Sequence, residues 1–401
     1  RFVRKAEIHT KGMISPGTLF EELGFEYIGP INGHNTVELV KILRNLKRKD
    51  NPRLLHIITK KGKGYAPAES DPIGFHAINK IKPIKNNGSL KKKEKSVTYS
   101  DIFGEWLCYK ADVDTRLMAI TPAMREGSGM TNFSKLFKER FFDVAIAEQH
   151  AITFAAGMAC EGLKPIVAIY STFLQRAYDQ LIHDVALQNL DVLFAIDRAG
   201  LVGSDGSTHQ GSFDISFLRC IPNMIIMTPS NEKVAWEMLN TGFEYEGPAS
   251  VRYPRGNGPQ VKFKKDNKVI EIGKSKLIKD SENRNLAILS FGSCLEVALE
   301  VGLQLDASVI DMNFVKPLDT KRIQEIANSH KLLVTLEENA VMGGAGSAVT
   351  EYLVKGNYKA AILNLGFPDE FINHGTKESQ LIKTGLNKEA IVDLIKKKIQ
   401  S

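Results

Sequence analysis

Short apolar runs alternate with amphipathic segments over most of the chain after residue 97. The first group contains five runs of strand length, at Leu117–Thr121, Phe142–Ile146, Pro165–Tyr170, Val192–Asp197 and Met224–Thr228. A helix begins near Ser100, and the helical patterns between the strands cover Glu148–Gly162, Thr172–Asn189 and Asn231–Phe243. Strands that are apolar throughout and separated by helices indicate a parallel sheet with both faces covered.

A second alternating unit begins near Lys268. Its predicted strands are Leu286–Phe291, Val309–Met312, Leu332–Glu337 and Ala361–Gly366. Its predicted helices are Leu295–Leu303, Thr320–His330, Gly346–Val354 and Lys388–Ile399. The fold class is therefore α/β, with two doubly wound, mainly parallel sheets.

The region before residue 97 contains fewer predicted helices and strands. A helix follows Asn35 or Thr36 as its cap, with apolar residues at Val37, Leu39, Val40, Leu43 and Leu46. A strand covers Arg53–Thr59. One βα piece cannot form a sheet with a closed core. Because residues 80–95 are rich in Lys, Asn and Gly, we expect a domain remnant at 1–80, a linker at 81–96, and domains at 97–263 and 264–401.

Composition narrows the class of protein. The 401 residues are 43% hydrophobic and 25% charged, as in ordinary globular proteins. No apolar run is long enough for a membrane span, and no secretory signal pattern is present. The four cysteines lie far apart without CxxC spacing, which argues against a zinc site and fits a reducing compartment. We expect a cytoplasmic protein that does not bind membranes.

The net charge of +7 is partly local. One lysine cluster lies in the linker and another ends the C-terminal helix, at residues 91–95 and 396–398. Such clusters favour either a solvated face or a nucleic-acid patch. Since no nucleic-acid motif or interleaved aromatic residues accompany the lysines, we expect no nucleic-acid partner.

Polar residues follow the predicted strands of the first sheet, where ligands of open α/β sheets bind. Glu148 follows one strand and opens a helix. A carboxylate there is also explained by the helix dipole alone, so a catalytic role needs partners. The next strand end supplies candidates in Tyr170, Phe173 and Arg176.

Two further groups of residues have both a functional and a plain explanation. Asp205 and His209 lie in a loop rich in Gly and Ser, which suits either a lid with a proton-transferring imidazole or an ordinary mobile loop. Arg198 and Arg255 end two strands, and each suits either phosphate binding or a surface ion pair. His76, in a loop before the linker, is uninformative alone.

Longer stretches of the sequence resemble a known family. They are Gly17–Gly24, Thr59–Tyr65, Thr121–Gly129, Phe142–His150, Ala168–Gln180, Asp197–Gly200, Gly206–Gly211 and Arg252–Gly256. These stretches are similar to the 1-deoxy-D-xylulose-5-phosphate synthases, which are thiamine-diphosphate enzymes of the transketolase superfamily. The resemblance covers essentially the whole chain and is strongest in its middle domain. It implies a remnant of a diphosphate-binding domain, a pyrimidine-binding domain and a transketolase C-terminal domain.

The resemblance assigns roles around the cofactor thiamine diphosphate. It implies that Glu148 hydrogen-bonds N1′ of the aminopyrimidine, because Glu148 stands in the matching Ala-Glu-Gln-His stretch. It places Phe173 against the pyrimidine, Arg176 beside it and Tyr65 at its border. His76 and His34 match family histidines, of which the first lies near the reacting centre, so both are candidate catalytic residues.

The resemblance also implies the substrates, pyruvate and glyceraldehyde 3-phosphate, which are joined with loss of carbon dioxide in a homodimeric enzyme. The product would feed isoprenoid, thiamine and pyridoxal precursor synthesis. Five residues match positions that bind the phosphorylated acceptor, with His209 also a candidate for catalysis: Tyr170, Arg198, Asp205, His209 and Arg255.

Departures from the family pattern leave other functions open. No Gly-Asp-Gly motif for the diphosphate and Mg²⁺ is present, and the first residue is Arg1, so we expect the metal ligands in an upstream domain. Asn32 and Ser204 replace the usual Asp and Ala. One alternative is a catalytically silent fragment. The other is a β-type subunit of a 2-oxo acid dehydrogenase, against which the acceptor-phosphate residues and the segment 1–80 argue.

Overall fold

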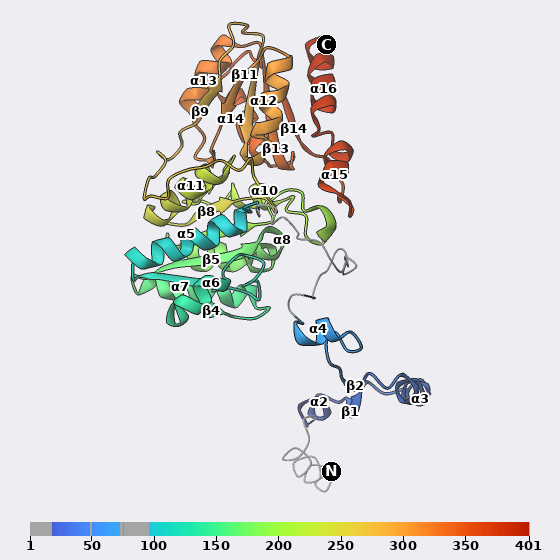
Figure 1. Cartoon of the computed structure of the whole chain (residues 1–401). Helices are drawn as coiled ribbons and strands as arrows, with labels where there is room; N and C mark the ends of the chain where they lie inside the picture. The colour runs from blue at the N-terminus through green and yellow to red at the C-terminus, as the bar shows by residue number, and fades with distance from the viewer. Residues whose placement is uncertain (1–17, 49, 73–74, 76–95, 401) are drawn as a thin grey trace, which may run out of the picture. The chain divides into compact units, whose positions relative to one another are not determined.

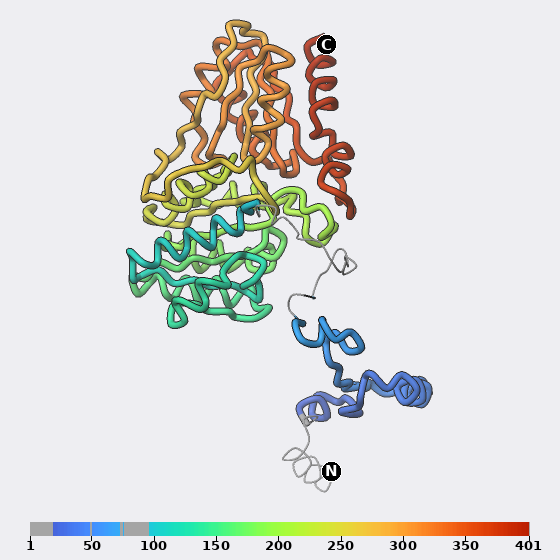
Figure 2. Tube along the Cα trace, in the orientation of Figure 1, coloured from blue at the N-terminus to red at the C-terminus, as the bar shows by residue number. Residues whose placement is uncertain are grey.

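A computed structural model describes residues 18–48, 50–72, 75 and 96–400 of the chain. The chain divides into two compact units, residues 1–92 and 93–401, and each is described by itself. Figures 1 and 2 colour the chain from blue at the N-terminus to red at the C-terminus.

The first unit contains one small parallel sheet, formed by β1 (Glu26–Asn32) and β2 (Arg53–Ile58). Its described helices are α2 (Thr18–Glu22), α3 (Thr36–Leu46) and α4 (Ala66–Ser70). The Asn35 side chain caps α3 by accepting a hydrogen bond from the Glu38 amide, so of the two predicted caps, Asn35 and Thr36, the first is correct. Of the residues described in this unit, Ala68 alone is buried. No residue of α3 is buried, so the described part of this unit agrees with the prediction that the piece closes no core of its own.

The second unit contains a seven-stranded sheet in the order β12-β7-β8-β6-β5-β3-β4, in which only β12 is antiparallel to its neighbour. Its strands are β3 (Leu117–Thr121), β4 (Phe141–Asp143), β5 (Lys164–Tyr170), β6 (Leu193–Asp197), β7 (Ile225–Met227), β8 (Ala249–Arg252) and β12 (Phe314–Lys316). Helices cover both faces, as Figure 1 shows. The longer helices are α5 (Tyr99–Val113), α7 (Glu148–Cys160) and α11 (Glu232–Glu244).

Alternate residues of each central strand pack on opposite faces of this sheet. In β5, Ile166 and Ala168 join the core against α5 and α11, whereas Val167 and Ile169 join the core against α7. A strand buried on both faces needs apolar residues at every position, which explains the unbroken apolar runs in the sequence. The shorter helical elements on this sheet are α6 (Thr131–Leu136), η1 (Lys138–Arg140), α8 (Ser171–Leu174), η2 (Gln175–Ala177), α9 (Tyr178–Gln180), η3 (Leu181–Ala186), η4 (Gly203–Asp205) and α10 (Asp214–Leu218).

A second sheet has the order β14-β13-β10-β11-β9, in which only β9 is antiparallel to its neighbour. Its strands are β9 (Lys276–Lys279), β10 (Leu286–Phe291), β11 (Ser308–Asp311), β13 (Leu332–Ala340) and β14 (Ala361–Phe367). Its helical elements are η5 (Gly292–Cys294), α12 (Leu295–Gln304), α13 (Thr320–Ser329), α14 (Ala345–Lys355), α15 (Lys377–Thr384) and α16 (Lys388–Gln400). One core cluster runs from Ile169 and Ile215 to Ala287 and Leu289, so the two sheets share a hydrophobic core.

The α/β class with two mainly parallel sheets is confirmed, and several details differ from the prediction. The single helix expected over Thr172–Asn189 is divided into α8, η2, α9 and the π-helical turn η3. The strands β1, β8, β9 and β12 and the helix α15 were not predicted, because they are short or carry polar residues. Among the helices that the structure describes, none combines the length and apolar character needed to cross a membrane.

Candidate active site

The polar residues that follow the strands of the seven-stranded sheet meet at one edge. The register pairs the last residue of β5, Tyr170, with the last residue of β6, Asp197, and pairs Thr121 of β3 with Asp143 of β4. Eight of the eleven predicted site residues lie at the end of β5 or in the segments that follow β4, β5, β6 and β8. The fold therefore gathers at this edge the side chains that the sequence suggested.

Glu148 is the first residue of α7 and its side chain is 2% exposed. Both carboxylate oxygens lie 2.9 Å from Nη1 of Arg176, in η2, whose own side chain is 54% exposed. A buried carboxylate is stable as an anion only when a positive charge or hydrogen bonds compensate it. Arg176 supplies that compensation from one side, and the carboxylate keeps capacity to accept a further hydrogen bond.

A row of ring contacts runs from the ends of β5 and β6 to His209 in the loop 203–211. The rings of Tyr170 and Phe173 are stacked with centroids 5.5 Å apart, and His209 meets Phe173 edge-on at 5.3 Å. The Arg198 guanidinium lies 4.2 Å from the centre of the Tyr170 ring. Burial raises the pKa of Tyr170 to about 12, so its hydroxyl remains a hydrogen-bond donor at neutral pH.

Arg198 adopts a left-handed conformation with φ 59°, which is uncommon outside glycine. Its Nη1 donates to the Gly127 carbonyl at 2.7 Å and to Asp197 at 2.8 Å, whereas its buried Nε has no partner among the residues that the structure describes. Burial raises the pKa of Asp197, and the Arg198 charge opposes that rise. A Cβ at position 127 would overlap the Tyr170 hydroxyl, which explains the glycine there.

Arg255 holds the other side of the loop that follows β6. Its Nε pairs with Asp205 at 3.1 Å, and its Nη1 donates to the Val202 carbonyl at 2.9 Å and the Ser204 hydroxyl at 3.3 Å. The Ser204 hydroxyl thus accepts a hydrogen bond from Arg255 that the Ala expected from the family pattern could not accept. Both arginines form ion pairs, but neither pair is an exposed surface pair, since the Arg198–Asp197 pair is buried and the Arg255–Asp205 pair is half-buried. Both arginines also line a cavity.

The cavity has a volume of about 680 Å³ and lies between the two sheets' loops. Its wall includes both arginines, the N-terminus of α5, the backbone of Gly203, and Lys377 at the start of α15. The α5 N-terminus is already capped, because Thr98 and Asp101 form a reciprocal capping box. The wall also includes the carboxylates of Asp101, which accepts from Thr98, and Glu126, which accepts from Arg125. Its three cations, Arg198, Arg255 and Lys377, suit an anionic ligand.

Two further residues were not predicted: Lys377, which lines this cavity, and its partner Glu338, which lines a neighbouring cavity that shares Lys377. Glu338 is buried and accepts hydrogen bonds from the Leu201 amide at 3.0 Å and the Ser293 hydroxyl at 2.9 Å, while Lys377 pairs with it at 3.3 Å. Burial alone would raise the pKa of Glu338, but Lys377 and these donors hold it below its ordinary value. The run Glu337-Glu338-Asn339 at the end of an apolar strand was the available signal.

The remaining predicted residues belong to the first unit. His34 accepts a hydrogen bond at Nε2 from the Lys60 amide at 2.7 Å. Tyr65 is 44% exposed and packs edge-on against Phe75 with centroids 5.7 Å apart. His76 lies outside the described residues. Among the residues that the structure describes, no cluster of His, Cys, Asp and Glu could hold a metal ion.

The residues present fit the pyrimidine half of thiamine diphosphate. Glu148 offers a buried acceptor for a ring nitrogen, and Phe173 offers a ring face in the same loop cluster. Next to Phe173, the Thr172 hydroxyl is buried without a partner in the described part of the chain. A polar atom left unpaired in this way is typical of a site that a ligand or water completes.

Family comparisons agree with this geometry. Residues 95–260 match the transketolase pyrimidine binding domain, residues 275–391 the transketolase C-terminal domain, and residues 1–59 the 1-deoxy-D-xylulose-5-phosphate synthase family. Among solved structures, a split-gene transketolase described as an inactive β4 tetramer is 28% identical with a TM-score of 0.68, covering 76% of this chain and 99% of its own. The transketolase of Campylobacter jejuni is 17% identical with a TM-score of 0.62, covering 96% of this chain and 70% of its own, which shows the common fold.

Curated relatives are more similar. The 1-deoxy-D-xylulose-5-phosphate synthase of Histophilus somni (strain 2336) is 60% identical over 400 residues, and that of Hahella chejuensis is 58% identical over 398 residues. These alignments cover 100% and 99% of this chain, but 64% and 62% of the relatives. The chain thus spans just under two thirds of the length of these relatives. On these matches, the chain belongs to the 1-deoxy-D-xylulose-5-phosphate synthase family of transketolase-like proteins.

Proposed function

We propose that the chain carries the pyrimidine-binding and acceptor-binding parts of an enzyme that condenses pyruvate with glyceraldehyde 3-phosphate. The products would be 1-deoxy-D-xylulose 5-phosphate and carbon dioxide, and the sugar phosphate would supply isoprenoid, thiamine and pyridoxal synthesis. The observation that carries this proposal is 60% identity to a curated synthase along 400 residues. The match of residues 1–59 to the synthase family favours it over a 2-oxo acid dehydrogenase subunit.

For the cofactor, we propose that Glu148 holds N1′ of the aminopyrimidine of thiamine diphosphate. When bound, this cofactor supplies a nucleophilic carbon and an electron sink for decarboxylation. The buried carboxylate of Glu148, compensated by Arg176, supports a strong hydrogen bond there. Phe173 would pack on the pyrimidine and Tyr65 would border it. We propose Mg²⁺ as the partner of the diphosphate, with ligands from the upstream part of a longer chain.

For the acceptor, we propose that Arg198 and Arg255 bind the phosphate of glyceraldehyde 3-phosphate. Arginine forks match phosphate oxygens, and both residues line the same cavity. Tyr170 and Asp205 would orient the acceptor's hydroxyl groups. His209 contacts Thr208 through Nδ1 at 2.9 Å, which leaves Nε2 for a proton at the acceptor oxygen. His34 and His76 remain candidates for proton transfer.

We propose a homodimer as the working assembly and the domain division at 1–80, 81–96, 97–263 and 264–401. The second candidate is a catalytically silent fragment that lacks the metal-diphosphate site, since the chain spans only 64% of its Histophilus relative. The two candidates differ in cofactor binding, because a rise in melting temperature of the 401-residue chain with thiamine diphosphate and Mg²⁺ would reject the silent fragment.

A chimera tests the main proposal. These 401 residues would replace the matching stretch of the Histophilus somni relative, and carbon dioxide release would be followed with thiamine diphosphate, Mg²⁺ and both substrates. We expect release that requires both substrates, and a loss of about 10²-fold or more for Glu148→Ala. Glu161→Ala, at the exposed end of the same helix, is the matched control and should leave the rate unchanged.

Two outcomes would contradict this proposal. One is a chimera that folds but releases no carbon dioxide while the unaltered relative does. The other is a Glu148→Ala chimera with the unaltered rate, because the buried carboxylate would then have no part in the reaction.

A further inference from the structure

We call the 680 Å³ cavity lined by Arg198 and Arg255 the acceptor cavity. Its third cation is Lys377, which follows the strands of the second sheet. Lys377 is the first residue of α15, which Thr376 caps by accepting a hydrogen bond from the Ser379 amide at 3.1 Å. A Cβ built on Gly203 would lie 3.6 Å from the Lys377 amide nitrogen. The start of α15 is therefore packed directly against the loop that carries Asp205 and His209.

Gln380, one turn further along α15, fixes this packing. Its side-chain oxygen accepts a hydrogen bond from the Gly203 amide at 3.0 Å, and its side-chain nitrogen donates to the Gly203 carbonyl at 3.2 Å. A glutamine that satisfies both polar groups of one residue holds that residue in a single place relative to the helix. The position of Lys377 at the cavity wall thus follows from the fold rather than from a freely moving loop.

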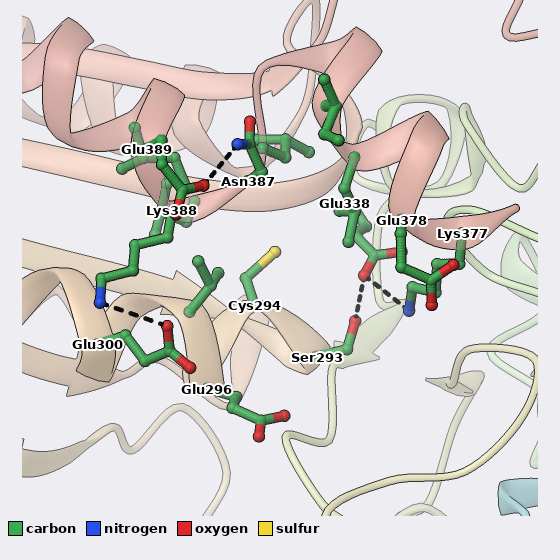
Figure 3. A pocket seen from close by; sticks show the side chains of 16 residues that line it. Ser293, Cys294, Glu296, Glu300, Glu338, Lys377, Glu378, Asn387, Lys388 and Glu389 are labelled. Carbon is green, nitrogen blue, oxygen red and sulfur yellow. Dashed lines mark hydrogen bonds and ion pairs between the residues drawn. The ribbon is translucent and has the colours of Figure 1, made fainter.

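Each of the three cations, Arg198, Arg255 and Lys377, forms an ion pair with a carboxylate. Arg198 pairs with Asp197 and Arg255 with Asp205, as described above. Lys377 pairs in the same way with Glu338, at 3.3 Å, and Figure 3 shows these two side chains meeting beside Ser293. Side-chain exposure differs within this last pair, at 37% for Lys377 and 6% for Glu338. Glu338 and Ser293 line a neighbouring cavity of about 440 Å³, and Lys377 belongs to the walls of both that cavity and the acceptor cavity. The buried Glu338 carboxylate therefore holds the ammonium group where the two cavities adjoin.

Glu338 also fixes the backbone next to Arg198. Its carboxylate accepts from the Leu201 amide at 3.0 Å, and a Cβ at Gly200 would overlap that carboxylate. The Glu338 carbonyl accepts from Nη2 of Arg252 at 3.0 Å. The buried Glu338 carboxylate thus connects Lys377 to the backbone segment that carries Arg198.

We propose that Lys377 is a phosphate-binding residue of the acceptor site and that Glu338 is its positioning residue. This inference rests on the proposed function, since it adds a contact to the same phosphate. A lysine supplies a compact point charge, whereas the two arginines supply oriented forks. Its expected contribution is to the affinity for phosphorylated ligands, with little effect on an unphosphorylated aldehyde of the same carbon skeleton.

Calorimetric titration of the 401-residue chain tests this inference without requiring turnover. The probes are glyceraldehyde 3-phosphate, inorganic phosphate and unphosphorylated glyceraldehyde. We expect Lys377→Met to weaken binding of both phosphate probes about tenfold, with no change for glyceraldehyde, and Lys377→Arg to restore most of the affinity. Lys383→Met is the matched control, because Lys383 lies on the same helix, pairs with Glu370 and is not part of the cavity wall.

A second variant separates phosphate binding from a merely structural ion pair. In Lys377→Met, the buried Glu338 loses its partner, which by itself could disturb the Leu201 backbone. If that disturbance were the cause, adding Glu338→Gln would restore affinity, and this restoration would overturn the inference. A direct phosphate contact predicts that the double variant stays weak.

Failure of the inference and failure of the proposed function give different results. Unchanged phosphate affinity in Lys377→Met, with the unaltered chain binding well, rejects the role of Lys377 alone. No binding of either phosphate probe by the folded, unaltered chain rejects the acceptor site as a whole.

Discussion

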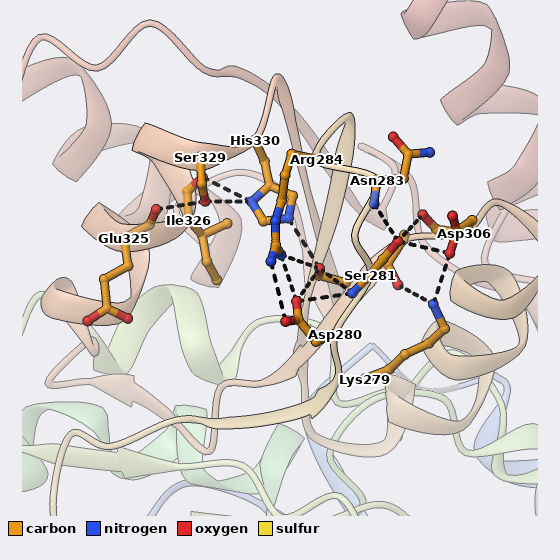
Figure 4. Close-up of polar contacts among 12 residues, drawn as sticks. Lys279, Asp280, Ser281, Asn283, Arg284, Asp306, Glu325, Ile326, Ser329 and His330 are labelled. Atoms are coloured by element: carbon orange, nitrogen blue, oxygen red, sulfur yellow. Dashed lines mark hydrogen bonds and ion pairs between the residues drawn. The ribbon is translucent and has the colours of Figure 1, made fainter.

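At the amino ends of β10, β11 and β13, polar side chains hydrogen-bond to one another, whereas at the carboxyl ends of the first sheet several buried polar atoms have no partner. We call the first group the amino-end network and define it as Asp280, Ser281, Arg284, Ser308 and His330 (Figure 4). The second group is the acceptor edge. Its unpartnered atoms, among the residues that the structure describes, belong to Ser128, Thr172, Arg198, Gln210 and Tyr253.

The amino-end network is closed. Ser308 donates to Asp280 at 3.2 Å, accepts from the Ser281 amide at 3.1 Å and contacts Nε2 of His330 at 3.2 Å. In the described chain, none of its five side chains has a buried polar atom without a partner. A closed network stabilises the fold, whereas unmet hydrogen-bonding capacity at the ends of parallel strands is typical of a ligand site. The contrast separates two clusters that look equally polar in the sequence.

The largest expected effect concerns the buried ion pair at the acceptor edge. Arg252 contacts Asp214 with both Nε and Nη2, at 2.5 and 3.1 Å, and Asp214 also accepts from Ser171 at 3.0 Å. Asp214→Ala should lower the free energy of unfolding by about 3–5 kcal/mol, because it leaves the buried guanidinium uncompensated. Urea unfolding measures this change.

The control for this prediction is Glu105→Ala, which removes the exposed partner of Lys265. Exposed pairs contribute about 0–1 kcal/mol. A cost for Asp214→Ala no larger than that of the control would mean that the acceptor edge is held by packing and not by its ion pairs.

The next effect depends on pH. Burial raises the pKa of Glu337 to about 7 from its ordinary value of 4.5, although the amides of Ala345 and Gly346 and the charge of Arg252 oppose the rise. The folded state therefore holds a proton that the unfolded state has released between pH 4.5 and pH 7. Stability from this group is complete below pH 4.5 and is lost as pH rises through 7, by about 3 kcal/mol in total.

Glu337→Gln should remove that loss. The variant and the unaltered chain should unfold alike at pH 5, and the variant should be relatively more stable at pH 8, as urea unfolding at both pH values would measure. Glu325→Gln, on the exposed side of α13, is the matched control. An equal difference at both pH values would show that the Glu337 carboxyl titrates normally.

The amino-end network gives a smaller effect. Ser308→Ala removes the hydroxyl that contacts Nε2 of His330 and donates to Asp280, so we expect a loss of about 1–3 kcal/mol. Phosphate binding at the other end of the strands should not change. If Ser308→Ala weakened phosphate binding as much as Lys377→Met, the amino-end network would not be purely structural.

Much of the fold could be predicted because strands buried on both faces must be apolar throughout. Leu286–Phe291 is predicted and observed with the same bounds. The strand β8 was missed since Ser250 and Arg252 break its apolar pattern, and tertiary contacts make these residues compatible with burial. Ser250 donates to the Ile225 carbonyl, and Arg252 pairs with Asp214.

The candidate site was predictable only in part, because some of its contacts join residues that are far apart in the sequence. Glu148, Tyr170 and Arg198 follow strands of one sheet, so their meeting at one edge follows from the topology. The contact of Glu338 with the Leu201 amide joins β13 of the second sheet to the loop after β6 of the first, 137 positions apart. The polar run Glu337-Glu338-Asn339 is visible in the sequence, but no local pattern says that Glu338 contacts the Leu201 amide and Lys377, so these contacts emerge only from the structure.

The smallest expected effect is a gain in stability rather than a loss. It tests the comparison of the acceptor edge with the amino-end network. Tyr253 is buried, its ring stacks on Tyr99 and Phe103, and its hydroxyl has no partner in the described chain. Tyr253→Phe keeps the ring and removes only the unpaired hydroxyl, so stability should stay the same or rise by up to about 1 kcal/mol. Tyr178→Phe is the matched control, because the Tyr178 hydroxyl donates to the Phe217 carbonyl at 2.6 Å and its loss should cost about 1 kcal/mol. Urea unfolding of both variants distinguishes the cases, and an equal loss for Tyr253→Phe would mean that a bound water satisfies the hydroxyl and that the acceptor edge is as closed as the amino-end network.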